Sequence, residues 1–194
     1  MRRNVAILVF DDVEVLDFAG PFEVFAVADE LASHAVFNVF TVAPRPGVVR
    51  AKNGLRIVPD YAVEACPPVH VLVVPGGSGT RPLLGNPVIM EWIRTRSRDA
   101  EATMSVCTGA LLLARAGILD GLRATTHHEN IGELRALAPR ATVDPGALFH
   151  DNGAVLTSAG ISAGIDCSLH LVGRMLGAGA AAAAANYMEY GPGR

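Results

Sequence analysis

Short apolar runs alternate with longer mixed segments along the 194 residues of the chain. Runs that are apolar at almost every position are typical of strands covered on both faces, as in a parallel sheet. They predict strands at residues 5–10, 37–43, 70–74 and 102–106. The segments between them predict helices over about residues 17–32, 86–98 and 110–115. Pro21 and Pro87 would then fall in first helical turns, where proline is tolerated.

The remaining segments predict shorter elements, marked by turn dipeptides and brief apolar runs. The first is a hairpin over residues 50–59 around Asn53-Gly54. Short strands at 123–126 and 141–143 then flank a helix near 129–137, and a turn at 151–153 joins strands at 149–150 and 154–158. A last helical region covers 162–187. Alternating strands and helices predict a single α/β domain with a doubly wound, mostly parallel sheet.

Ligands of such sheets bind beyond the carboxyl ends of the strands. Three segments should therefore converge there, namely residues 14–20, the loop at 75–79 and Cys107. We expect the candidate site at this edge of the sheet.

Cys107 stands between a predicted buried strand and a predicted helix, with the small residues Ser105 and Gly109 two positions before and after it. A nucleophile at a sharp strand-to-helix turn needs small neighbours at those positions. The turn would aim the thiol at the N-terminus of the following helix, where free N–H groups and the helix dipole favour a thiolate. The pattern predicts a nucleophile-elbow cysteine, although a buried structural cysteine is the alternative.

Gly76 and Gly77 follow a predicted buried strand, and glycine lets the backbone approach a ligand closely. Together with the N–H of Thr108 they predict a cradle for a developing oxyanion, with Ser78 next to it in the pocket. The loop matches neither of the common glycine-rich phosphate-binding patterns, so a nucleotide is not indicated.

Asp17 lies in an otherwise apolar segment. One interpretation is a helix N-cap, for which aspartate is well suited. The other is a carboxyl group in a partly dry pocket beside Cys107, where burial and a nearby thiolate would raise its pKa and let it carry a proton. Glu14 and Glu23 compete for this second role.

His127-His128-Glu129 suggests a metal ligand or a base, but adjacent histidines on a helix point in different directions, so we expect no metal there. His127 and His128 remain candidates for the pocket wall. The other histidines and cysteines stand alone and are interpreted as structural or surface residues: His34, His70, His150, His170, Cys66 and Cys167.

Composition restricts the partners. The net charge is −3 with both signs scattered, which gives no reason to expect nucleic acid or an anionic membrane as partner. No apolar stretch reaches the length of a membrane span, and the first apolar run stops at Asp11-Asp12 without a signal-peptide cleavage site. Three cysteines without Cys-x-x-Cys spacing indicate neither a disulfide framework nor a zinc site. We expect a cytoplasmic protein.

Five segments together resemble the ThiJ/PfpI superfamily, and within it the isonitrile hydratase group. They are Leu16-Asp17-x-x-Gly20-Pro21, Pro75-Gly76-Gly77, Ser105-Val106-Cys107-Thr108-Gly109, Ala124-Thr125-Thr126-His127 and Ser158-Ala159-Gly160-Ile161-Ser162-Ala163-Gly164-Ile165-Asp166. The resemblance extends from about Val5 to Tyr190. It implies one ThiJ/PfpI-like (class I glutamine amidotransferase-like) domain over residues 1–194, a flavodoxin-like sandwich, a homodimer, a small-molecule substrate and no cofactor.

The resemblance also implies roles for three residues. The Cys107 thiolate would attack the terminal carbon of R–N≡C and form a covalent thioimidate. Asp17 would supply a proton and then help to activate water, releasing an N-substituted formamide. Thr108 would hydrogen-bond Asp17 and hold its orientation.

Departures from other branches of the superfamily sharpen this expectation. The peptidase-like branch has histidine directly after the cysteine, where this chain has Thr108. The glyoxalase and chaperone-like branch uses an early glutamate, where this chain has Asp17. His128 stands where the hydratase group has tryptophan, which bears on the substrate. The alternatives are a ligand-sensing domain related to AraC-type regulators, and a redox or stress protein in which Cys107 is oxidised reversibly.

Overall fold

The structure, a computed structural model, describes residues 2–191. Its central strands are β1 Arg3–Leu8, β2 Phe37–Ala43, β5 Tyr61–Ala62, β6 Val71–Val74, β7 Ala102–Val106, β10 Phe149–Asp151 and β11 Val155–Ser158. They form one seven-stranded sheet in the order β10-β11-β7-β6-β1-β2-β5. All pairings in it are parallel except that of β10 with β11. The predicted doubly wound, mostly parallel sheet is confirmed.

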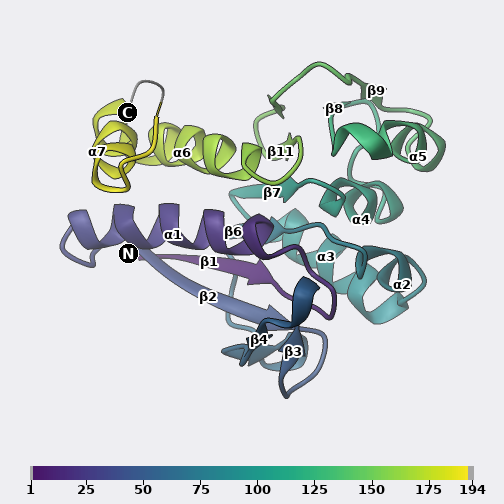
Figure 1. The fold of residues 1–194 in the computed structure, drawn as a ribbon, viewed down its shortest axis with the longest axis horizontal. Coiled ribbons are helices and arrows are strands. Elements are labelled where there is room, and N and C mark those ends of the chain that lie inside the picture. The colour runs from purple at the N-terminus through teal and green to yellow at the C-terminus, as the bar shows by residue number, and fades with distance from the viewer. Residues whose placement is uncertain (1, 192–194) are drawn as a thin grey trace.

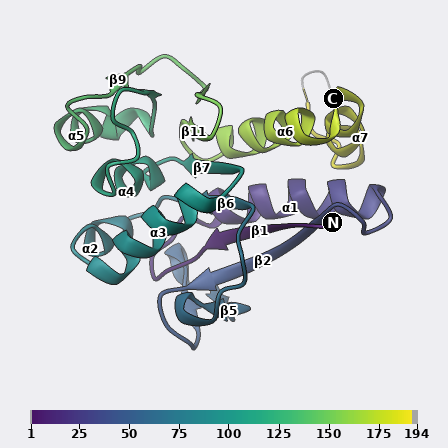
Figure 2. The same cartoon turned by 180° about the vertical axis from the view of Figure 1, so that it is seen from behind.

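Helices cover both faces of this sheet (Figures 1 and 2). On one side lie α1 Val15–Leu31, α6 Ala163–Leu176 and α7 Ala178–Tyr187, and on the other lie α2 Thr80–Leu84, α3 Pro87–Asp99 and α4 Gly109–Arg115, with α5 Ile131–Leu137 against α4. The chain moves from β1 to β2 in one direction and from β6 to β7 in the opposite direction. Right-handed crossovers therefore place the two sets of helices on opposite faces.

The reversal of direction between β1 and β6 sets the position of the site. Loops leaving the carboxyl ends of these neighbouring strands turn to opposite faces, which opens a crevice between them. In this chain the two loops are tied together by an antiparallel bridge between Val13 and Gly77. The Glu14 N–H donates to the Gly76 carbonyl at 2.9 Å. The start of α1 is therefore fixed against the loop at 75–79, called the glycine loop below.

Helix α1 begins two residues earlier than the sequence predicts, at Val15 after an extended Glu14. Pro21 therefore lies inside the helix rather than in its first turn. The missing N–H of Pro21 leaves the carbonyl of Asp17 without its usual helical partner. For α3 the prediction holds, because Asn86 caps it through its side chain and Pro87 occupies the first turn.

Several short elements differ from the predictions. The hairpin is formed by β3 Val49–Arg50 and β4 Arg56–Ile57, with the 3₁₀ turn η1 Lys52–Gly54 between them. The strands β8 Arg123–Ala124 and β9 Thr142–Val143 pair with each other outside the main sheet. The helical region predicted over 162–187 is broken at Gly177, whose φ of 95° cannot continue a helix.

Within residues 2–191, no helix combines the length and the apolar character that crossing a membrane requires.

Candidate functional site

Cys107 occupies the turn between β7 and α4 with a φ of 55°, a left-handed conformation that costs a side chain energy. The turn is tight enough that a Cβ on Gly109 would lie 1.9 Å from the carbonyl oxygen of Val74. Ser105 on the preceding strand is fully buried. The small residues that drew attention in the sequence are thus imposed by close packing around a strained cysteine.

The thiol of Cys107 is buried, with the residue only 6% exposed. Backbone N–H groups of Thr108 and Ile161 and the hydroxyl of Thr108 lie where they stabilise negative charge on the sulfur. Burial, and then the nearby charge of Asp17, nevertheless raise the pKa of Cys107 to about 12. The expectation of a thiolate favoured by the helix N-terminus is therefore wrong for the free protein, because desolvation outweighs the N–H groups of a seven-residue helix.

Asp17 is completely buried in the first turn of α1. Its Oδ2 accepts a hydrogen bond of 3.0 Å from the N–H of Gly76, whereas the buried Oδ1 has no hydrogen-bond partner among residues 2–191. Burial raises the pKa of Asp17 to about 7, and the charge of Glu14 adds to the increase. The Gly76 N–H, the Cys107 thiol and the charge of Lys52 act in the opposite direction. Asp17 is not an N-cap, since that position belongs to Glu14.

The thiol and the carboxyl group form one unit. Cys107 acts on the pKa of Asp17 and Asp17 acts on that of Cys107, so the two side chains face each other across the junction of the two loops. Burial raises the pKa of both groups, so the unit favours holding protons on both the thiol and the carboxyl group more strongly than the free side chains do. A carboxylate in this position can accept the thiol proton as the sulfur begins to attack.

Gly76 and Gly77 do not form the predicted oxyanion cradle. The Gly76 N–H is bonded to Asp17, and the Gly77 N–H donates to Oγ1 of Thr108 at 2.9 Å. Of the predicted donors, the Thr108 N–H does face the sulfur, and the N–H of Ile161 joins it there. Ile161 was missed in the sequence, where its only signal is its place in the segment 158–166.

The hydroxyl of Thr108 is hydrogen-bonded to Gly77 rather than to Asp17, the partner that the resemblance implies. This hydroxyl accepts from the Gly77 N–H and lies 3.2 Å from the Gly77 carbonyl, to which it can donate. The same hydroxyl acts on Cys107. Thr108 thus holds the glycine loop, and the loop in turn holds Asp17 through Gly76.

Gly76 is required by this packing. A Cβ there would lie 2.5 Å from Thr108 N, 2.6 Å from Thr108 Oγ1 and 2.9 Å from Asp17 Oδ2. We expect Gly76→Ala to lower the free energy of unfolding by about 1–3 kcal/mol, as overpacking does. Displacing the Gly76 N–H from Asp17 should also move the alkylation of Cys107 by chloroacetamide to higher pH, measured by peptide mapping.

Gly132→Ala is the matched control for Gly76→Ala. A Cβ on Gly132 in α5 would meet nothing within 4 Å, so this substitution should leave the alkylation unchanged and stabilise the helix slightly. If Gly76→Ala matches wild type in both the free energy of unfolding and the pH dependence of alkylation, the loop is not packed as closely as described.

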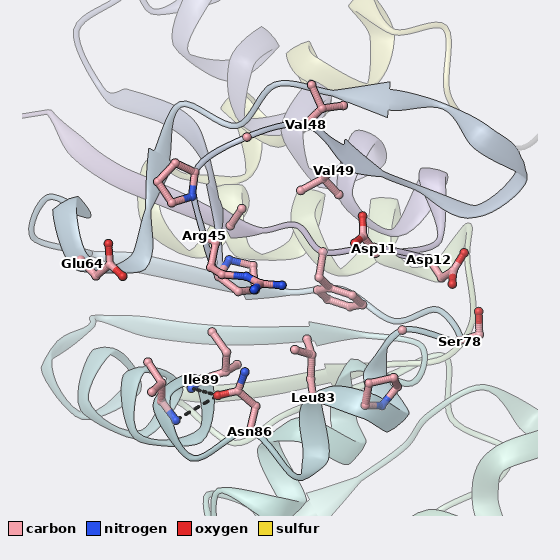
Figure 3. Close-up of a pocket in the computed structure, with 18 residues that line it drawn as sticks. Asp11, Asp12, Arg45, Val48, Val49, Glu64, Ser78, Leu83, Asn86 and Ile89 are labelled. Atoms are coloured by element: carbon pink, nitrogen blue, oxygen red, sulfur yellow. Dashed lines mark hydrogen bonds between the residues drawn. The ribbon is translucent and has the colours of Figure 1, made fainter.

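The three predicted pocket residues lie in different places. Ser78 is exposed and lines a separate cavity of about 990 Å³, to which Cys107, Asp17 and Thr108 do not contribute. Figure 3 shows Ser78 at one end of this cavity with Asp11 and Asp12, and Glu64 at the other end.

His127 is partly buried with its ring against Gly160, the neighbour of Ile161, and is thus connected to the cysteine. His128 is exposed, and its ring centroid lies 4.3 Å from that of His127. The two rings lie side by side and do not diverge as the sequence predicts, because the backbone of His127 is extended ahead of the 3₁₀ turn η3 His128–Asn130. Across residues 2–191, no group of three or more metal-ligating side chains gathers in a way that would hold a metal ion.

Of the competing acids, Glu14 lies at the site and Glu23 does not. The Glu14 carboxylate is 2.7 Å from the ammonium of Lys52, and its charge reaches Asp17. Glu23 is exposed, and its charge acts on Tyr187 of α7. The remaining histidines and cysteines make local contacts or are buried away from the site: His34 with Asp29, His70 with Asn4, His150 with Asp144, His170 with Asp151, and the free Cys66 and Cys167.

Comparisons with known proteins show which proteins the chain resembles. Isonitrile hydratase of Pseudomonas putida is 35% identical over 196 residues, which cover 99% of this chain and 80% of that protein. The HTH-type transcriptional regulator GbdR of Pseudomonas aeruginosa is 28% identical over 97% of the chain. The chain spans only about half of that regulator, 51% of its length.

A solved structure shares the whole fold. The crystal structure of a ThiJ/PfpI family protein from Pseudomonas syringae has a TM-score of 0.89 and 28% identity, covering 100% of this chain and 77% of that one. The sequence profile of the DJ-1/PfpI family matches residues 3–174, which include Asp17, the glycine loop and Cys107. The chain therefore belongs to the DJ-1/PfpI family.

Proposed function

We propose that the protein hydrates isonitriles, R–N≡C, to N-substituted formamides through a covalent bond to Cys107. The observation that carries this proposal is the buried Cys107–Asp17 unit, in which a thiol faces a carboxyl group beside two backbone N–H groups. The similarity to an isonitrile hydratase over nearly the whole chain supports the same reaction class.

In the first half of the proposed reaction, the carboxylate of Asp17 accepts the thiol proton while the sulfur of Cys107 attacks the terminal carbon of the isonitrile. A carbon–sulfur bond forms, and Asp17 returns the proton to the same carbon. The product is a thioimidate, R–N=CH–S–Cys107. The pKa of about 7 suits Asp17 to both transfers, since it can accept and donate a proton at neutral pH.

In the second half, Asp17 accepts a proton from water as the water oxygen attacks the thioimidate carbon. Asp17 passes this proton to the nitrogen, which gives the tetrahedral intermediate R–NH–CH(OH)–S–Cys107. As the intermediate collapses, its hydroxyl proton moves to Asp17, the formyl C=O forms and the carbon–sulfur bond breaks. Asp17 then returns the proton to the sulfur of Cys107. The N–H groups of Thr108 and Ile161 stabilise the departing thiolate.

The R group of the substrate is proposed to be apolar. Leu16 and Ile161 are large hydrophobic residues, each 38% exposed. Leu16 precedes Asp17 in the chain, and Ile161 supplies a backbone N–H to the sulfur. Apolar side chains left open beside a reactive group favour an apolar ligand.

Formamide production from cyclohexyl isocyanide by the purified protein tests this proposal. Protein whose Cys107 has first been alkylated with chloroacetamide serves as the control with an unchanged sequence. Turnover that this alkylation removes is the expected result. A folded protein that makes no N-cyclohexylformamide, with this and with linear alkyl isocyanides, would contradict the proposal.

A ligand-sensing function is the second candidate. The similarity to GbdR covers 97% of this chain but only 51% of the regulator, so the same domain also occurs within longer transcriptional regulators. Saturable binding of an isonitrile or formamide, measured by calorimetry without any turnover, would favour this function. The redox alternative requires a thiolate at Cys107, whereas burial raises the pKa of this thiol.

A further inference from the structure

Lys52 is the only lysine among the 16 basic residues of the chain, and the hairpin carries it to the candidate site. Its ammonium lies 2.7 Å from the carboxylate of Glu14. The backbone N–H of Glu14 donates to the carbonyl of Gly76, and the N–H of Gly76 donates to the carboxyl group of Asp17. The single lysine thus connects, through one ion pair and two backbone bonds, to the carboxyl group of the site.

The hairpin that carries Lys52 is firmly attached. The Lys52 N–H donates to the Val13 carbonyl at 2.9 Å, and the Asp12 N–H donates to the Arg50 carbonyl at 2.7 Å. The Arg50 N–H donates to Oδ1 of Asp11 at 2.8 Å. These three bonds fix the hairpin to residues 11–14, which lead directly into α1 and Asp17. The backbone of Lys52 is therefore fixed beside the start of α1, and its half-exposed side chain reaches Glu14 through the ion pair.

We propose that Lys52 is a positioning residue whose ammonium, oriented by Glu14, supplies the positive charge that stabilises the single negative charge shared by Asp17 and Cys107. This inference rests on the proposed function. The charge passes from the carboxylate to the sulfur and back during the proposed reaction, and a cation that reaches both groups stabilises every one of these states.

The charges around the unit support this role. Asp17 and Cys107 both contribute to raising the pKa of Lys52, after the larger contribution of Glu14. Glu14 raises the pKa of Asp17 and Lys52 lowers it, so the ion pair holds two opposed charges next to one carboxyl group. A lysine ammonium is a compact charge that tunes a neighbouring pKa without a planar bonding geometry.

The test measures the pH dependence of Cys107 alkylation by chloroacetamide, with the modified peptide quantified by mass spectrometry. The rate of alkylation should rise with pH in two steps. Ionisation of Asp17 should set the midpoint of the step at lower pH, because its carboxylate is the base for the thiol. Lys52→Met should move this midpoint up by roughly half a pH unit, the modest size expected of a solvent-screened charge. Glu14→Gln should move it down, and Lys52→Arg should restore the wild-type value. Arg56→Met, on the same hairpin, is the control and should leave the midpoint unchanged.

Chemical modification gives an independent readout, because Lys52 is the only side-chain amine. Acetylation removes its charge and reductive methylation keeps it, so acetylation alone should shift the midpoint of the wild type. The same reagents on Lys52→Arg control for the N-terminal amine. Equal shifts after both modifications, or parallel loss of reactivity in Lys52→Met and Glu14→Gln without any change of midpoint, would overturn the proposal.

Failure of the hydration proposal gives a different result from failure of this inference. If the wild type shows no isonitrile turnover while the alkylation midpoints shift as expected, the reaction is wrong and the role of Lys52 in the charge balance stands. If turnover is present and the midpoints do not move, Lys52 has no such role.

Discussion

Cys107→Ala is expected to abolish formamide production from cyclohexyl isocyanide, by roughly 10⁴-fold or more, as loss of a covalent nucleophile does. Alanine removes only the sulfur. The left-handed backbone, the Gly109 contact with Val74 and the hydrogen bond from Thr126 to the Cys107 carbonyl can all persist. The thermal midpoint of unfolding should therefore stay close to that of the wild type, and the loss can be assigned to chemistry.

Cys66→Ala is the control for Cys107→Ala. Cys66 is also a buried free cysteine, and it lies in the loop before β6. Its thiol donates a hydrogen bond to the carbonyl of the neighbouring Pro67. Its substitution should leave turnover within about twofold of wild type, as for a change away from the site. Substantial activity in Cys107→Ala would refute the covalent mechanism, whatever the control shows.

The location of the site follows from the sequence because it depends on local patterns. Buried strands followed by small residues predict where loops leave the sheet, and the parallel topology brings these loops to one edge. Asp17, Gly76 and Cys107 were placed together in this way, and the structure confirms that they meet. The demand for a small residue at Gly109 was also predictable, because the strand-to-helix turn itself requires it.

The partners within the site do not follow from the sequence because they depend on tertiary geometry. The hydroxyl of Thr108 could reach Asp17 or Gly77, and only the path of the glycine loop selects Gly77. Ile161 reaches the sulfur through a backbone N–H, which no side-chain pattern reveals. Lys52 arrives on a hairpin whose attachment to residues 11–14 is made by main-chain bonds over long sequence separations.

The protonation state of the thiol was mispredicted for a related reason. A helix N-terminus lowers a thiol pKa, and the sequence shows that helix but not how completely the turn is buried. The balance depends on solvent exclusion, which only the packed structure reveals. The consequence for function is that Cys107 needs a base, and Asp17 is the carboxyl group whose charge acts on it.

Asp17→Asn is expected to lower turnover by about 10²- to 10⁴-fold, the range for loss of a general acid–base group. The amide has the same shape, and its carbonyl oxygen can still accept the Gly76 N–H. It cannot take the thiol proton, so alkylation of Cys107 should also lose its lower pH midpoint and rise only as the thiol itself ionises. The measurements are kcat and the pH profile of alkylation.

The same substitution should make the protein more stable at high pH. Burial raises the pKa of Asp17 from 3.8 to about 7 in the folded protein, so the folded state binds this proton more tightly than the unfolded chain does. The free energy of unfolding of the wild type should therefore fall as pH rises from about 4 to 7, by a few kcal/mol in order of magnitude, because the fully buried carboxylate loses its hydration. Asparagine has no such titration, so Asp17→Asn should gain stability relative to wild type across this range and be the more stable protein at about pH 8. Denaturant unfolding at a series of pH values measures this difference. Parallel stability profiles for the two proteins would show that Asp17 titrates normally, and would remove the basis for its role as the proton carrier.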